Sequence, residues 1–262
     1  MGEAAGPAWQ PPAELVDRAR ALAAGTLVAA EPRHASTVVL LRDTPTGLEV
    51  HLQRRVASMA FAAGAYVFPG GRVDDADAAV EVDLPPGWAR VLTGEPPDEP
   101  LARTLVVAAV RETFEEVGVL LTDDPLPADR AAARRQDFAS LGVRPATRLL
   151  APWARWVTPA FEPRRYDTRF FAAALPEGQT AAGDDAGGEA DRAVWMAPAE
   201  ALARHRDGEL VMLPPTVFTL AELTEYADAA AVLAAAVERD CKPVLPRLLV
   251  EGDTARFLTH DD

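Results

Sequence analysis

The stretch RETFEEVG, residues 111–118, places three glutamates within five positions and ends on a glycine. In a helix, Glu112 would lie beside Glu115 and Glu116, at spacings of three and four residues. Like charges at these spacings destabilise a helix by roughly 0.2 to 0.5 kcal/mol per pair. We therefore expect a compensating partner outside the helix.

The preceding residues extend this stretch into the most strongly predicted helix of the chain. LARTLVVAAV, residues 101–110, has apolar side chains at helical spacing. Asp98 or Glu99 suits the N-terminus of this helix, and Gly118 suits its C-terminal cap. At 100° per residue, the three glutamates lie opposite the apolar face, so their carboxylates should converge away from the core.

Divalent cations are the partner that best explains these three carboxylates. An all-oxygen site suits Mg²⁺ or Mn²⁺, which prefer hard oxygen ligands. The alternative is a solvated acidic helix face, and for an isolated E-x-x-E-E pattern that alternative would be the stronger one. The rest of the sequence favours the metal site.

Composition restricts the classes of partner. The 262 residues carry 40 acidic and 26 basic side chains, a net charge of −14, and Lys242 is the only lysine. Such a surface repels a nucleic-acid backbone, so we expect no nucleic-acid partner. Cys241 is the single cysteine, which excludes an intramolecular disulfide and a cysteine-based zinc cluster. No signal peptide and no apolar run of about 18 residues is present, so we expect a cytoplasmic protein without a membrane partner.

The coarse pattern along the chain indicates both strands and helices. We expect strands at 36–43, 48–55, 65–71, 153–159, 165–175 and 192–198, helices at 12–25, 198–208 and 220–240, and a hairpin within 246–262. Residues 72–100 are rich in Asp, Pro and Gly and are expected to be an inserted, partly irregular segment. Because long surface insertions cost little closure entropy, trimming this segment should leave a folded protein.

The sequence resembles the Nudix hydrolases, whose signature is G-x5-E-x7-R-E-U-x-E-E-x-G-U, where U is apolar. Residues 111–119 match its second half, with Thr113 at one apolar position, and Gly71, preceded by Gly70, is the best opening glycine. In the signature the arginine follows the glycine by 14 positions. Here Arg111 follows Gly71 by 40 positions, which corresponds to an insertion of 26 residues. The spacing therefore leaves the first signature glutamate open: counted from the glycine its place falls on Asp77, and counted back from the arginine it falls on Arg103. If Asp77 only imitates that acid, Asp77→Asn should have little effect.

Further stretches resemble the peroxisomal coenzyme A diphosphatases, a Nudix subfamily that carries a long insertion at this point. They are residues 54–77, 108–121, 156–159, 164–176 and 213–215. The resemblance implies a Nudix-type α/β/α sandwich with a mixed sheet, an insertion within the Nudix box and an additional C-terminal helix. We divide the chain into a lead and helix at 1–34, a Nudix domain at 35–208, which contains the insertion 72–100, and a C-terminal helical extension at 209–262 that packs on the same domain.

Metal-binding and catalytic residues follow from the resemblance by position. Glu112, Glu115, Glu116 and the Gly70 carbonyl are the expected metal ligands, and Glu112 or Glu116 is expected to receive the proton of the attacking water. A fourth ligand often precedes a later tryptophan in the family, which indicates Glu189, with Asp191 as the rival and a solvated loop acid as the alternative to both.

Structural and substrate-binding roles are assigned in the same way. Gly71, Arg111 and Gly118 are expected to be structural parts of the box. Arg54 and Arg55 are candidates for clamping a phosphate, with a surface ion pair as the alternative. For Arg165 and Tyr166, either substrate contact or bracing of a strand end would explain the match.

The resemblance implies Mg²⁺-dependent hydrolysis of a diphosphate bond, with Mn²⁺ as a substitute, in coenzyme A or acyl-CoA. Products would be adenosine 3',5'-bisphosphate and (acyl-)phosphopantetheine. Alternatives are hydrolysis of another nucleotide, such as NADH, a nucleotide sugar or a dinucleoside polyphosphate, and a nucleotide-sensing module without turnover. The complete glutamate set disfavours the sensor. The family's habit of dimerising suggests a homodimer.

Overall fold

The centre of the fold is a mixed sheet that begins with the predicted hairpin. The computed structural model describes residues 13–56, 63–181, 190–251 and 254–258. Strand β1 (Arg33–Thr44) pairs with β2 (Gly47–Arg55) in antiparallel register, and Thr44 lies opposite Gly47 at the turn. The other strands of this sheet are β3 (Tyr66–Val67), β4 (Gly70–Arg72), β5 (Ala151–Val157), β6 (Tyr166–Ala174), β7 (Ala190–Met196) and β8 (Pro243–Val244).

The sheet branches at its first two strands. Its main order is β3-β2-β1-β6-β5-β8, while β4 also pairs with β1 and β7 also pairs with β2. The β1–β6 and β5–β8 pairs are parallel and the others are antiparallel, so the sheet is mixed, as expected. The expected strand at 65–71 is interrupted, because β3 pairs with β2 while β4 crosses to β1.

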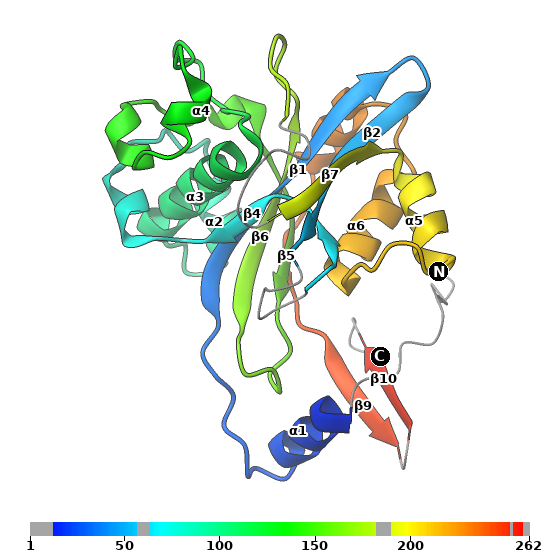
Figure 1. The fold of residues 1–262 in the computed structure, drawn as a ribbon. Coiled ribbons are helices and arrows are strands. Elements are labelled where there is room, and N and C mark those ends of the chain that lie inside the picture. Colours follow the sequence, from blue (N-terminus) through cyan, green and yellow to red (C-terminus); the bar gives the residue numbers. More distant parts are fainter. Residues whose placement is uncertain (1–12, 57–62, 182–189, 252–253, 259–262) are drawn as a thin grey trace.

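Helices cover both faces of the sheet, which confirms the α/β/α architecture (Figure 1). Helix α3 (Glu99–Val117) packs with α2 (Trp88–Thr93) on one face, and α5 (Pro198–Arg206), α6 (Pro214–Leu223) and α7 (Ala229–Ala236) pack on the other. Strand β1 serves both layers, because Val38 and Leu40 face the α3 side while Val39 and Leu41 face the other. This alternation is the period of two expected for a strand buried on both faces.

Helix α3 has the ends that the sequence predicts. The Asp98 carboxylate accepts a hydrogen bond from the Leu101 N–H at 2.9 Å, and Gly118 caps the C-terminus in the left-handed conformation with φ of 73°. The buried Thr113 hydroxyl donates to the Ala109 carbonyl at 2.7 Å. That bond explains how a hydroxyl occupies an otherwise apolar position of the box.

The insertion 72–100 belongs partly to the core, contrary to the expectation of a removable surface segment. It forms a 3₁₀ helix, η1 (Asp75–Ala79), and α2, and it buries Val82 and Leu92 in the core on the α3 side. Its far end is anchored by Arg169, which is fully buried and donates to the Leu92 carbonyl at 2.7 Å. We therefore no longer expect trimming to leave a folded protein.

The single helix expected at 220–240 is wrong, because the structure has two helices there. Helix α6 ends at Leu223, and Asp228 starts α7 by accepting a hydrogen bond from the Ala231 N–H at 2.7 Å. An aspartate in this extended conformation satisfies the first free N–H groups of a new helix, which interrupts the old one.

The remaining elements lie at the periphery. Helix α1 (Ala13–Ala23) contacts β9 (Arg247–Glu251), which pairs with β10 (Thr254–Leu258) in the expected terminal hairpin. Short helices α4 (Arg130–Ala133), η2 (Phe138–Leu141) and η3 (Thr147–Leu149) follow α3. Within the part of the chain that the structure describes, no helix is long and apolar enough to cross a membrane.

Candidate metal and catalytic site

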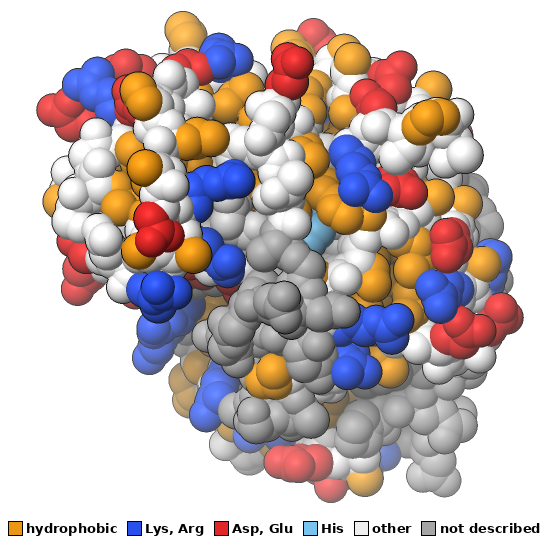
Figure 2. Space-filling view, turned by 45° about the horizontal axis from the view of Figure 1, so that its top comes forward, with side chains coloured by type: hydrophobic (Ala, Val, Ile, Leu, Met, Phe, Trp, Pro, Cys, Tyr) orange, Lys and Arg blue, Asp and Glu red, His pale blue; other side chains and the backbone are white. Residues whose placement is uncertain are grey.

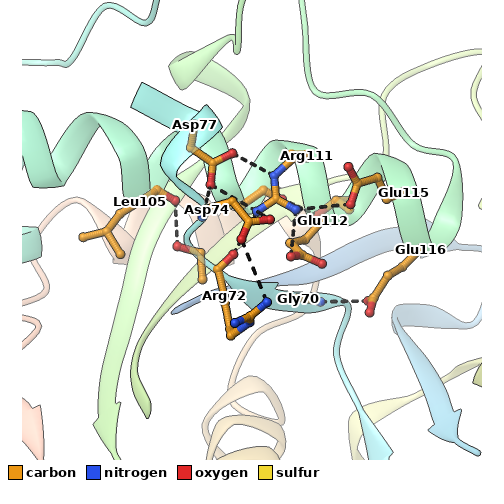
Figure 3. A network of polar contacts seen from close by, with 12 residues as sticks. Gly70, Arg72, Asp74, Asp77, Leu105, Arg111, Glu112, Glu115 and Glu116 are labelled. Carbon is orange, nitrogen blue, oxygen red and sulfur yellow. Dashed lines mark hydrogen bonds and ion pairs between the residues drawn. The ribbon is translucent and has the colours of Figure 1, made fainter. Parts of the chain in front are cut away.

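Arg111 is the centre of the polar network at the C-terminal half of α3 (Figure 3). Its guanidinium donates to Glu112 at 2.8 Å, to Glu115 at 3.2 Å and to the Arg72 carbonyl at 2.8 Å. Burial disfavours the Arg111 charge, but hydrogen bonding to Asp77 and attraction to Glu112 outweigh this and raise the Arg111 pKa. The structural role predicted for Arg111 fits these contacts, and this arginine is one compensating partner for the clustered glutamates.

Asp77, one of the two candidates for the first signature glutamate, contacts Arg111. It is 2% exposed, and its two carboxylate oxygens accept from Arg111 Nε at 2.7 Å and Nη2 at 3.1 Å. The backbone N–H of Asp74 donates to the same carboxylate at 2.8 Å. Arg103 instead bonds to Glu99 and to the Val82 carbonyl. The contact with Arg111 favours Asp77 over Arg103, and which residue replaces the first signature glutamate stays a prediction.

Gly71 lies against the Glu112 carboxylate. A Cβ atom added at Gly71 would lie 2.5 Å from Glu112 Cδ, whereas one added at Gly70 would lie 2.7 Å from the Thr37 Cα atom. The first clash involves the end of a flexible side chain, and the second involves rigid backbone. Close approach of backbone therefore requires glycine at position 70, while the absence of a side chain at Gly71 lets Glu112 lie directly over β4.

Glu115 is more solvated than Glu112, with a side chain that is 34% exposed. Desolvation raises its pKa above the usual glutamate value, although Arg111 opposes this shift. Glu112 is only 15% exposed, which disfavours the interpretation of a freely solvated acidic face.

Glu116 points away from the Arg111 network and toward Gly70 (Figure 3). Its Oε2 accepts from the Gly70 N–H at 2.9 Å and from the Nε2 of Gln53 on β2. Just beyond it, Arg134 donates to the main-chain carbonyls of Glu115 and Glu116, each at 2.8 Å through Nη2. A cation at this position satisfies carbonyls that the helix leaves free at its C-terminus.

The donor chemistry of this site fits a hard divalent cation. The glutamates of α3 and the main chain of β4 supply oxygen atoms, and the contacts described above include no sulfur or imidazole ligand. However, among residues 13–56, 63–181, 190–251 and 254–258, no three His, Cys, Asp or Glu side chains form a group that could hold a metal. The ligand roles of Glu112, Glu115, Glu116 and Gly70 therefore stay predictions.

Glu189, the expected fourth ligand, lies outside the described residues. Strand β7 begins at the next residue, Ala190, which lies opposite Arg55. On the same pair of strands, Gln53 lies opposite Ala193. The chain thus enters β7 at the end of β2 that is close to Gln53, and the role of Glu189 stays a prediction.

The proposed substrate-binding residues fall into two groups. Arg54 and Arg55 end β2 directly after Gln53, and because side chains alternate along a strand, Arg54 faces away from Gln53. Phosphate contact by Arg54 and Arg55 stays a prediction. Arg165 instead donates to the Thr158 carbonyl at 3.0 Å and the Ala30 carbonyl at 2.7 Å, which favours bracing of the strand end.

Tyr166 lies with Arg165, away from the box glycines. On β1, Tyr166 lies opposite Arg33 whereas Gly70 lies opposite Thr37, four residues further along. At about 3.3 Å per residue this separation is about 13 Å. Substrate contact by Tyr166 stays a prediction.

Sequence reasoning missed two polar residues of this site, Gln53 and Arg134. Gln53 was detectable as a polar residue two positions after His51 in a strand whose other face is apolar. Arg134 had no signal, because its contact with α3 depends on the path of the loop that follows the helix.

The comparison with known families decides the membership of the chain. A family model described as the NUDT19 Nudix domain matches residues 89–223, which is more than half of the chain. The chain belongs to the Nudix hydrolase family. This confirms the expected family and fold class, and the Nudix box is the network around Arg111.

Relatives of the NUDT19 type are similar over most of this Nudix chain. The acyl-coenzyme A diphosphatase NUDT19 of Gallus gallus is 27% identical over 237 residues, which cover 70% of this chain and 62% of the relative. The Homo sapiens protein of the same name is 28% identical over 233 residues, covering 69% and 62%. The chain therefore spans about 62% of the length of these curated relatives.

A solved Nudix structure supports the fold. A NUDIX hydrolase from Alicyclobacillus acidocaldarius is 30% identical with a TM-score of 0.63, and the match covers 78% of this chain and 96% of that one. This solved structure therefore supports both the family assignment and the α/β/α architecture of the chain.

Proposed function

We propose that this Nudix protein hydrolyses the diphosphate bond of coenzyme A or its acyl thioesters, with Mg²⁺ as the cofactor and Mn²⁺ as a substitute. The products are adenosine 3',5'-bisphosphate and phosphopantetheine or its acyl form. Similarity to the NUDT19 acyl-coenzyme A diphosphatases, at 27 to 28% identity, supports this substrate class.

One observation carries the catalytic part of the proposal. Glu112 lies over Gly71 and Glu116 accepts from the Gly70 N–H, so two box carboxylates meet the same glycine pair. Nudix hydrolases use divalent metal ions, and Glu112, Glu115, Glu116 and Gly70 are the residues that would hold them here. When bound, such a cation neutralises the diphosphate and stabilises charge on the leaving oxygen.

Of the two candidates for the general base, the contacts favour Glu116. Glu112 forms an ion pair with Arg111 Nη1 at 2.8 Å, which stabilises its charged form. Glu116 accepts hydrogen bonds from the Gly70 N–H and the Gln53 amide, which are neutral donors, and its charge also interacts with that of Arg134. A carboxylate held by neutral donors accepts a proton from water more readily than one paired with a guanidinium.

Local charge can attract an anionic substrate although the net charge is −14. Figure 2 shows several basic side chains on one face of the molecule, among acidic and hydrophobic ones. Arg54 and Arg55 supply two guanidinium groups at the end of β2. Guanidinium groups bind phosphate with a fixed fork geometry, so these two residues are proposed phosphate contacts.

The test is turnover of a nucleotide panel with Mg²⁺, followed by mass spectrometry of the products. The panel contains CoA, acetyl-CoA, NADH, a nucleotide sugar and a dinucleoside polyphosphate. Preferred cleavage of CoA or its thioester supports the proposal, and preferred cleavage of another member replaces the substrate. Nucleotide binding without any turnover would indicate a sensing module.

Matched glutamine variants connect turnover to the site. Glu116→Gln and Glu115→Gln should each lower turnover about 10²-fold or more, the order seen when transition-state charge loses a stabilising group. Glu99→Gln is the control, because Glu99 is exposed in the first turn of the same helix. Equal turnover in all three variants would remove the box from the mechanism.

Two further expectations accompany this proposal. A homodimer is predicted from the family's habit, and light scattering of the purified chain would test it. The predicted cytoplasmic location needs a fluorescent fusion in the source cell. The proposed reaction depends on neither the oligomeric state nor the location.

A further inference from the structure

Gln53 is a buried amide beside Glu116. Packing and hydrogen bonds among the described residues explain only in part why a polar side chain is present at this position. It is 3% exposed and lies on β2, between the buried Leu52 and the half-buried Arg54. Its Nε2 donates to Glu116 Oε2, the same oxygen that accepts from the Gly70 N–H. Gln53 thus fixes the orientation of one proposed metal ligand.

The orientation of the amide follows from its neighbour. Glu116 presents a carboxylate oxygen, which only accepts hydrogen bonds when it is ionised. Turning the amide over would bring Gln53 Oε1 against this oxygen and create repulsion. The donor therefore faces Glu116, and the oxygen occupies the other arm of the same amide group.

Gln53 Oε1 is buried and has no hydrogen-bond partner among the residues that the structure describes. Leaving a buried acceptor without a partner costs free energy, and native structures rarely retain one without a reason. An apolar residue such as methionine would fill this position without that cost. The amide is therefore better explained by something that its oxygen binds.

We propose that Gln53 is a further residue of the cation site, which positions Glu116 through Nε2 and offers Oε1 as an oxygen ligand to the cation, directly or through one bound water. Amide oxygens of Asn and Gln are established ligands of hard divalent cations, and these cations bind most proteins through a mixture of such oxygens and water. This inference rests on the proposed metal-dependent function.

The experiment measures Mn²⁺ binding to the full chain without substrate, by electron paramagnetic resonance and calorimetry. Gln53→Met keeps the side-chain length but removes both polar atoms, and it should weaken Mn²⁺ affinity by about 10- to 100-fold, the usual loss when a supporting residue of a metal site is removed. Gln53→Glu keeps an oxygen at this position but loses the Nε2 donor to Glu116, so it should bind Mn²⁺ more tightly than Gln53→Met. If Gln53→Met does not fold, Gln53→Asn withdraws the amide by one methylene and should show the same loss.

Gln179 supplies a matched control. It is also a buried amide, but both ends are satisfied by Leu120, whose N–H donates to Oε1 at 2.9 Å and whose carbonyl accepts from Nε2 at 2.8 Å. Gln179→Met should lower thermal stability and leave Mn²⁺ affinity unchanged. A general effect of removing a buried amide would instead weaken Mn²⁺ binding in both variants.

The outcomes separate this inference from the proposed function. Wild-type Mn²⁺ binding with equal affinity in Gln53→Met overturns the role of Gln53 and leaves the metal mechanism intact. Absence of Mn²⁺ binding in the wild type overturns both. Loss of affinity in Gln53→Met that Gln53→Glu partly restores supports the oxygen-ligand role, and equal loss in both variants overturns it.

Discussion

Replacing Asp77 with asparagine tests whether the insertion supplies a working part of the Nudix box. Sequence reasoning alone expected little effect if Asp77 merely imitates the signature acid. The structure reverses this expectation, because both oxygens of the buried carboxylate accept hydrogen bonds from Arg111, at 2.7 and 3.1 Å. Asparagine keeps the volume but turns one acceptor into a donor that would face either Arg111 or the Asp74 N–H.

The magnitude follows from what Arg111 retains. Removing one partner of a buried ion pair costs about 3 to 5 kcal/mol, because the other charge is left without compensation. Arg111 keeps Glu112 at 2.8 Å and Glu115 at 3.2 Å, so we expect the lower end of the range, about 3 kcal/mol. At roughly 2 to 4 °C per kcal/mol for a domain of this size, the melting temperature should fall by about 6 to 12 °C.

The assay is urea unfolding of the metal-free protein together with turnover at saturating Mg²⁺. Asp75→Asn is the control, because Asp75 is exposed on the same 3₁₀ helix and its change should stay within about 0.5 kcal/mol. Turnover of Asp77→Asn should also fall, since Arg111 loses the buried partner that fixes its guanidinium beside Glu112. An unfolding free energy equal to that of Asp75→Asn would refute the role of Asp77.

Three further predictions follow from contacts in the fold. Gly71→Ala should lower turnover at least about tenfold with a small change in stability, because the new Cβ displaces only the end of the Glu112 side chain. Gly70→Ala should lower the unfolding free energy by about 1 to 3 kcal/mol, because its Cβ meets backbone atoms. Thermal melts and initial rates distinguish these two effects. Burial, followed by repulsion from Arg169, lowers the His34 pKa. This residue therefore contributes stability above its unfolded pKa of about 6.5, and that stability is lost as pH falls through the folded pKa. Urea midpoints between pH 7.5 and 5 should fall less in His34→Gln than in the wild type, and an equal fall in both proteins would contradict this. Deleting most of 72–100 should abolish cooperative unfolding, whereas a cooperative melt near the wild-type temperature would show that these residues are dispensable.

Local signals predicted those parts of the fold that depend on neighbours in the chain. The α3 helix, its Asp98 and Gly118 caps and the β1–β2 hairpin are encoded by short patterns, and the structure confirms them. The helix at 220–240 was mispredicted because its alanine-rich pattern outweighed one capping residue, Asp228.

Contacts between distant segments were less predictable. Spacing could not choose between Asp77 and Arg103, because that choice depends on where the insertion returns to α3. The Gln53 contact with Glu116 spans 63 positions, and no local pattern reports it. The glutamates themselves were identifiable, since their spacing on one helix fixes their common side.

The pairing of Asp77 with Arg111 has a consequence for how relatives of this chain are found. The two residues lie 34 positions apart in sequence, yet Arg111 Nε is 2.7 Å from Asp77 Oδ1. A search pattern that prescribes a fixed distance between the acid and the arginine passes over this sequence. A pattern that accepts aspartate, permits a gap of variable length after it, and then requires R-E-x-x-E-E recovers the sequence, so family searches gain coverage when the gap is placed at that one point.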